Sequence, residues 1–155
     1  MRKLIEAIAA LALAALLWTT YGALYGADKF IGQIPTRFGP GGQAVAYGPP
    51  SMLLLFPLIG MVLYALMTTV SFFPSSFNYP VRVTAQNRPR LQQIALNLVS
   101  FLKAETLVLF AAIQHQTIQA IRQQTNSLPV LLMPAALVLI FVTIALHLAA
   151  MRRSA

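Results

Sequence analysis

Four apolar stretches, each long enough to cross a bilayer, alternate with polar or basic connectors along the chain. A helix needs about 20 mainly apolar residues to span roughly 30 Å of hydrocarbon. The pattern therefore predicts transmembrane helices at about residues 4–24, 52–73, 94–113 and 129–151. Residues 1–155 would then form a single domain, an all-α membrane protein built as a four-transmembrane-helix bundle.

The first apolar stretch follows a basic start, as in a signal peptide, but the pattern favours a helix that is retained. The run reaches spanning length, Glu6 interrupts its beginning, and Tyr25 fits poorly before a cleavage point after Ala27. Trp18, Tyr21 and Tyr25 would place an aromatic belt towards the far end of this helix.

The connector between helices one and two, residues 27–50, is rich in Gly and Pro, and its centre predicts a β-hairpin. Glycines give the turn at 39–42 its conformational freedom. An ordered ligand-binding loop and a plain ribbon that caps the bundle are both open interpretations. The candidate residues are Pro35, Thr36, Arg37, Phe38, Gly41 and Gly42. Ser51 is the expected N-cap of helix two, and Pro57 is expected to kink it.

The connector between helices two and three, residues 74–92, contains three arginines and two short polar motifs. The motif residues are Asn78, Tyr79, Pro80, Asn87 and Arg88, and the other arginines are Arg82 and Arg90. We expect an interfacial segment that is held by anionic lipid headgroups. A docking surface for a cytoplasmic partner is the alternative. Thr84 is expected to cap helix three.

The cationic residues are divided unequally between the two sides of this layout. Seven fall on the side of the chain termini, namely Arg2, Lys3, Arg82, Arg88, Arg90, Arg152 and Arg153. Three fall on the other side, namely Lys29, Arg37 and Arg122. Because cytoplasmic loops carry the excess of Lys and Arg, both termini and the connector 74–92 are expected in the cytoplasm. The hairpin would then be extracytoplasmic.

Two ionisable residues, Lys103 and Glu105, lie near the middle of the third apolar stretch. A charge at the centre of a spanning helix costs a few kcal/mol unless it is compensated. The two side chains point to nearly opposite sides of the helix, so each is expected to need its own partner on a neighbouring helix. Tyr64 is a candidate partner of Lys103 because it lies at a similar depth. Both a packing role and an ion or ligand site remain open.

A stripe of small or polar residues runs along the same helix through Asn97, Ser100, Ala104 and Ala111. Such residues let helices approach closely where lipid gives no hydrophobic drive. Depth counting also brings Glu6, Asn97 and His147 to similar levels, where they are expected to form a hydrogen-bonded cluster or, for Glu6 and His147, a titrating pair.

The end of helix three and the start of helix four carry further local signals. Residues 114–124 are expected to extend helix three beyond the membrane as an amphipathic segment, and Asn126 with Ser127 to break it. Pro129 would be tolerated in the first turn of helix four, and Pro134 is a candidate kink.

Composition excludes several classes of protein. Eleven basic and three acidic residues give a net charge of +8, yet no basic stripe or nucleic-acid motif accompanies it. There is no cysteine, so disulfides and thiolate-bound metals are excluded. The sequence contains no catalytic motif and no paired carboxylates, so we expect neither an enzyme nor a metal site nor a cofactor.

The segment Ile34-Pro35-Thr36-Arg37-Phe38-Gly39-Pro40-Gly41-Gly42-Gln43 resembles a family of bacterial integral membrane proteins with an Ile-Pro-Thr-His-Phe-Asn motif, related to the Sdp immunity protein family. The likeness continues through Asn78-Tyr79-Pro80-Val81, Val83-Thr84, Asn87-Arg88 and Leu102-Lys103-Ala104-Glu105. Arg37 and Gly39 stand where the family has His and Asn, so no metal or acid–base role is carried over. The resemblance implies a bacterial inner-membrane protein that senses, or protects against, an extracellular toxic peptide.

Three functions follow as hypotheses. The first is a non-catalytic sensor or immunity-type protein whose first loop engages an extracytoplasmic peptide or ligand. The second is an accessory or structural subunit of a larger membrane complex, whereas a small homo-oligomer would be compatible with the first. The third is a small ion or proton pathway through Lys103 and Glu105.

Overall fold

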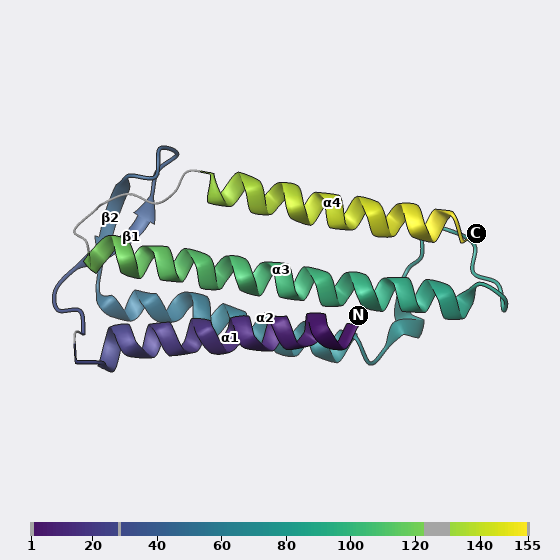
Figure 1. The fold of residues 1–155 in the computed structure, drawn as a ribbon, viewed down its shortest axis with the longest axis horizontal. Coiled ribbons are helices and arrows are strands. Elements are labelled where there is room, and N and C mark those ends of the chain that lie inside the picture. Colours follow the sequence, from purple (N-terminus) through teal and green to yellow (C-terminus); the bar gives the residue numbers. More distant parts are fainter. Residues whose placement is uncertain (1, 28, 123–130, 155) are drawn as a thin grey trace.

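The computed structural model describes residues 2–27, 29–122 and 131–154, and in this part of the chain four long helices lie side by side with a small two-stranded sheet at one end (Figure 1). The elements in order are α1 (Arg2–Tyr25), β1 (Ile34–Phe38), β2 (Ala44–Gly48), a 3-10 helix (Pro50–Leu54), α2 (Leu55–Val70), a second 3-10 helix (Pro74–Ser76), α3 (Arg88–Arg122) and α4 (Leu132–Arg152). The four long helical segments are apolar enough to cross a membrane, which fits a multi-pass membrane protein.

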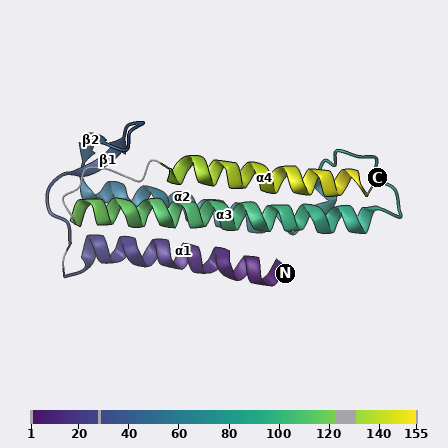
Figure 2. The ribbon, with the colours of Figure 1, turned by 45° about the horizontal axis from the view of Figure 1, so that its top comes forward.

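The two ends of the bundle differ. The sheet lies at one end, which we call the hairpin end. Both chain termini and the connector between α2 and α3 lie towards the other, which we call the terminal end (Figures 1 and 2). α3 is the central helix: it contacts α1, α2 and α4, and it runs between α1 and α4 in both views.

α1 and α3 run in the same direction, and the offset in residue number between contacting residues stays constant over four helical turns. Ser100 on α3 hydrogen-bonds Glu6 on α1, and Gln114 hydrogen-bonds Thr20, and both pairs are separated by 94 residues. Between these two polar contacts the interface is made by buried Ala9, Leu16 and Leu107 together with smaller neighbours. The predicted stripe of small residues is therefore in contact with α1 at Ser100 and Ala104, which are buried.

α2 approaches this helix pair most closely at Gly60. A Cβ atom at Gly60 would lie 3.1 Å from Cδ2 of Leu16 and 3.4 Å from Cδ2 of Leu107. The absence of a side chain therefore lets α2 pack against both α1 and α3.

The hairpin has the predicted position and turn. β1 and β2 pair antiparallel, with Ile34 opposite Gly48 and Phe38 opposite Ala44. The turn at 39–42 closes with a hydrogen bond from Gly42 N to the Gly39 carbonyl, and Gly42 has a φ of 80°, which favours glycine. Buried Ile34 anchors the hairpin in a core cluster with Ala23, Leu53 and Ile118.

The start of helix two differs from the prediction at Ser51. Ser51 is not an N-cap, because it lies inside the 3-10 helix Pro50–Leu54, whose first residue is a proline with a preset φ. Pro57 falls in the first turn of α2, and the change from 3-10 to α geometry occurs just before it. A proline has no N–H to give to the carbonyl four residues earlier, so regular α geometry is not continued across this point.

The start of α3 is capped as predicted. Thr84 Oγ1 accepts from Asn87 N at 3.2 Å, and Asn87 Oδ1 accepts from Thr84 N at 2.8 Å, which is a reciprocal capping arrangement. The helix is longer than the crossing predicted at 94–113, and it continues without a break to Arg122. The predicted break at Asn126 and Ser127, and Pro129 with the predicted start of helix four, lie outside the described residues. Pro134 lies in the first turn of α4, where no kink is required.

Candidate functional sites

Lys103 is held by a cluster of polar groups from three helices, which we call the interhelical cluster: Glu6, Tyr64, Thr68, Ser100 and Lys103. Lys103 Nζ lies 2.5 Å from Glu6 Oε2 and 3.0 Å from Thr68 Oγ1, and it is 4.8 Å from the centroid of the Tyr64 ring. Ser100 donates to the other carboxylate oxygen of Glu6 at 2.6 Å. The expected contact between Lys103 and Tyr64 is confirmed, and the principal partner is Glu6.

The interhelical cluster is buried on the lysine side. Lys103 has 1% of its side chain exposed, whereas Glu6 has 30% exposed. The register of 94 residues places Lys103 level with Ala9, in the first third of α1, while Lys103 itself lies near the middle of α3.

Glu105 faces the opposite neighbour, α4. Thr143 Oγ1 donates to Glu105 Oε1 at 2.5 Å, and His147 Nδ1 donates to the Thr143 carbonyl at 2.8 Å. The prediction that Lys103 and Glu105 have separate partners is therefore confirmed. Glu105 Oε2 is buried and has no hydrogen-bond partner among the described residues.

The predicted cluster of Glu6, Asn97 and His147 is not formed by the described residues. Glu6 binds Lys103 and Ser100, Asn97 accepts from Gln93 of its own helix at 3.0 Å, and His147 packs its ring 5.4 Å from that of Phe101. The physical reason is the position of α3, which separates α1 from α4 (Figure 2). Similar depth alone therefore did not bring these side chains together.

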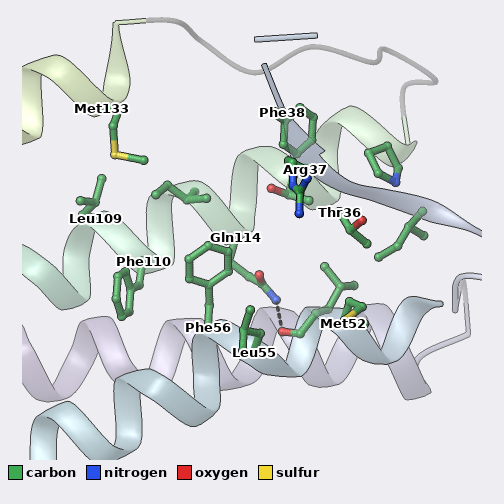
Figure 3. Close-up of a pocket in the computed structure, with 15 residues that line it drawn as sticks. Thr36, Arg37, Phe38, Met52, Leu55, Phe56, Leu109, Phe110, Gln114 and Met133 are labelled. Carbon is green, nitrogen blue, oxygen red and sulfur yellow. Dashed lines mark hydrogen bonds between the residues drawn. The ribbon is translucent and has the colours of Figure 1, made fainter. Parts of the chain in front are cut away.

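A cavity of about 450 Å³ lies between the hairpin and the helices, and we call it the hairpin pocket. Figure 3 shows its lining: Arg37 and Phe38 from β1 on one side, and Phe56, Phe110 and Gln114 from α2 and α3 on the other. Thr36 and Met133 also line it, and Arg37 is exposed. Four of the predicted hairpin residues, 35–38, thus border one pocket, whereas Gly41 and Gly42 form the turn.

Gln114 is the residue that sequence reasoning missed. It was expected on an extension beyond the membrane, yet it is fully buried and donates Nε2 to Thr20 Oγ1 at 2.7 Å and to the Leu53 carbonyl at 2.9 Å. Leu53 is four residues before Pro57, which has no N–H, so Gln114 supplies a donor to that carbonyl. This proline was the available sequence signal.

The orientation of the Gln114 amide follows from its partners. The Thr20 hydroxyl donates to the Leu16 carbonyl at 2.7 Å, so towards Gln114 it accepts, and the Leu53 carbonyl is also an acceptor. Both partners therefore require the amide nitrogen. The amide oxygen is left buried and without a partner among the described residues, in a side chain that lines the hairpin pocket.

The motif residues of the second connector mainly hold the connector itself. Burial raises the pKa of Tyr79, against the opposing charge of Arg88, so its hydroxyl stays protonated and donates to the Pro74 carbonyl at 2.8 Å. Asn87 caps α3 and donates Nδ2 to the Arg82 carbonyl at 3.0 Å. Asn78 and Pro80 line a groove beside Tyr79.

Within the described ranges, no group of three or more metal-ligating side chains is gathered at one place. No family model matches the chain, no curated protein matches it, and no solved structure matches it.

Proposed function

We propose that the protein is a non-catalytic sensor or immunity-type protein of the bacterial inner membrane that binds an extracytoplasmic peptide or similar ligand in the hairpin pocket. The observation that carries this proposal is the pocket of about 450 Å³ beneath residues 34–38. Its volume lies within the range of ligand sites, about 300–1,000 Å³, and such sites combine apolar walls with a few polar groups.

The lining of the pocket points to the chemistry of the ligand. Phe38, Phe56 and Phe110 offer apolar and aromatic surface, Arg37 offers a cation, and Gln114 offers an unpaired acceptor. A carboxylate would pair with the guanidinium group, and a peptide N–H would satisfy the amide oxygen. A short apolar peptide with a free carboxylate has both groups.

Two further observations support the extracytoplasmic position of the hairpin and the proposed class of protein. The seven cationic residues of the sequence pattern lie at the terminal end, and this excess favours cytoplasmic termini and an extracytoplasmic hairpin. The segment that resembles the Sdp immunity proteins, residues 34–43, contains the strand that borders the pocket. Ligand recognition and family likeness therefore involve the same residues.

Transmission of a signal would use α3. This helix of 35 residues carries Phe110 and Gln114 at the pocket and Arg88 at the terminal end. A ligand shifts the packing of the bundle only if it binds two arrangements with different affinity. The arginine-rich connector would then present the change to the cytoplasm.

A fluorescence titration tests ligand binding. Because the chain has no cysteine, Thr36→Cys allows one environment-sensitive dye at the pocket edge, in protein held in nanodiscs. We expect a saturable response to an acetylated tripeptide of leucine and phenylalanine with a free carboxylate. Arg37→Gln should weaken binding about tenfold, because it removes one charge-assisted contact.

Controls separate binding from partition into lipid. Phe110→Trp should block the response by filling the pocket, whereas Phe72→Trp, at an exposed position near the other end of the bundle, should not. The amidated form of the tripeptide should bind more weakly. An equal response to both peptides that Phe110→Trp leaves unchanged would show partition alone and would refute the proposal.

A subunit of a larger membrane complex is the second candidate, favoured by α4. This helix exposes a long apolar face that includes Leu137, Phe141 and Leu146. A groove of about 540 Å³ beside it is lined by α1, α3 and α4 and contains Glu105. Native gels in mild detergent distinguish the candidates, because a stable assembly with other proteins supports the subunit role and a monomer or small homo-oligomer supports the sensor.

A further inference from the structure

Two adjoining cavities lie at the terminal end of the bundle, far from the hairpin pocket. The outer cavity, of about 160 Å³, is lined by Arg88, Gln92, Ser75 and Val83. The inner cavity, of about 350 Å³, is a mainly apolar groove lined by residues 77–80 of the connector together with α3, α4 and the end of α2. Phe77 and Tyr79 line both cavities, so the two adjoin at these side chains, and we call them together the terminal groove.

The terminal groove changes from polar to apolar along α3. Arg88 and Gln92 line the outer cavity, and Ala95, Leu98 and Val99 line the inner one. At about 1.5 Å per residue, Leu98 lies roughly 15 Å further along the helix axis than Arg88. The polar part therefore faces the end of the bundle, and the apolar part faces its middle.

The inner cavity is bounded by three helices near their ends. Val70 is the last residue of α2, Met151 is next to the last residue of α4, and Leu148 lies one turn before it. Phe77 and Pro80 close the side towards the connector. An acyl chain fits this lining, in which apolar side chains outnumber the polar residues Asn78 and Tyr79.

The cation of the outer cavity has no acidic partner in the described part of the chain. Of the described acids, Glu6 binds Lys103 and Glu105 binds Thr143, both on other faces of the bundle. The Tyr79 hydroxyl is occupied with the Pro74 carbonyl. Arg88 is exposed and can therefore accept an anion from outside the described chain, and an outer cavity of this size has room for a phosphate.

We propose that the terminal groove binds one anionic phospholipid, with its phosphate against Arg88 and Gln92 and one acyl chain along Leu98 and Val99. The direction of the lipid follows from the change in polarity along α3. This site differs from general attraction of basic residues to a charged membrane, because one arginine lines a cavity and its neighbours Arg82 and Arg90 do not.

Native mass spectrometry of the full chain tests the proposal with phosphatidylglycerol and phosphatidylcholine as probes. We expect one retained phosphatidylglycerol per chain, in clear preference to phosphatidylcholine. Arg88→Gln should lower its retention about tenfold, because a charge-assisted phosphate contact is lost. Arg82→Gln and Arg90→Gln remove the same charge outside both cavities and should lower it no more than about threefold.

A second variant tests the acyl-chain part. Leu98→Trp fills the inner cavity and should reduce lipid retention while leaving Arg88 in place, and inorganic phosphate at millimolar concentration should not displace the lipid. Equal losses of lipid retention in the Arg82, Arg88 and Arg90 variants would show a diffuse charge effect and overturn the proposal. Displacement by phosphate, with no effect of Leu98→Trp, would assign the outer cavity to free phosphate and overturn it as well.

Discussion

Lys103 is the largest fully buried side chain in the described part of the chain. Its ammonium group has a carboxylate, a hydroxyl and an aromatic face as neighbours, from α1 and α2. Taking a charge away from water is costly, and removing one partner of a buried pair leaves the other charge uncompensated. These contacts fit a packing role, because each of them joins α3 to α1 or to α2.

The first prediction concerns the ion pair. Lys103→Met should destabilise the protein in detergent by about 2 kcal/mol, less than the 3–5 kcal/mol of a fully buried pair because Glu6 is partly exposed. Thermal unfolding followed by circular dichroism measures the change.

The double variant Glu6→Gln with Lys103→Met is the decisive comparison. It removes both charges together and should recover a large part of the lost stability. Lys3→Met, an exposed cation on the same helix as Glu6, is the matched control and should have little effect. Unchanged stability for Lys103→Met would contradict the role given to the interhelical cluster.

The second prediction concerns Gln114. Gln114→Leu should destabilise the protein by about 1–3 kcal/mol, because the Thr20 hydroxyl and the Leu53 carbonyl lose a buried donor. Gln116→Leu is the control, since Gln116 is only half-buried on the same helix. Equal unfolding temperatures for the two variants would rule out the assigned role of Gln114.

At the scale of elements, the apolar pattern was enough to predict four helices and the glycine-rich turn was enough to predict the hairpin, because length, hydropathy and turn composition are local properties. The partners of individual residues were not local. Glu6 was expected beside His147, but the register between α1 and α3 places it beside Ser100 and Lys103. That register depends on how side chains such as Ala9, Leu16 and Ala104 pack. It cannot be obtained by counting residues from the ends of the predicted helices.

The hairpin pocket shows the same division between local and non-local information. The strand that borders it was predicted from its turn, whereas the aromatic side of the pocket, made by Phe56 and Phe110, was not predicted. Phe56 and Phe110 lie 54 positions apart in sequence, and their ring centroids are 5.4 Å apart. Gln114 was placed outside the bundle because its neighbours are polar, although its carbonyl partner was marked by Pro57.

The third prediction concerns the approach of α2 at Gly60. Gly60→Val should destabilise the bundle by about 1–3 kcal/mol, because the new side chain would meet Leu16 and Leu107. Gly22→Ala is the matched control: no heavy atom lies within 4 Å of the added Cβ, so a helical alanine should stabilise by up to about 1 kcal/mol. Unfolding temperatures that shift in the same direction would contradict the close approach of α2.

At the scale of the whole molecule, the charge distribution gives a test of orientation. Val45 in the hairpin is exposed, and so is Arg153 beyond α4. The fourth prediction is that Val45→Cys reacts with a membrane-impermeant maleimide in intact spheroplasts, and Arg153→Cys reacts only after permeabilisation. The wild-type chain, which has no cysteine, is the unlabelled control. The reverse pattern would place the hairpin pocket in the cytoplasm and remove the basis for an extracytoplasmic ligand.

The shared register of α1 and α3 limits how the molecule can move. Sliding one of these helices past the other by a turn would break the Glu6–Ser100 and Thr20–Gln114 contacts at once, so the pair acts as a rigid frame. α4 is joined to that frame by a single hydrogen bond in the described residues, between Thr143 and Glu105. Met133 brings α4 to the edge of the hairpin pocket, and Met151 brings it to the terminal groove. Because α4 lines both cavities, a tilt of this helix against the frame would change the lining of the two together.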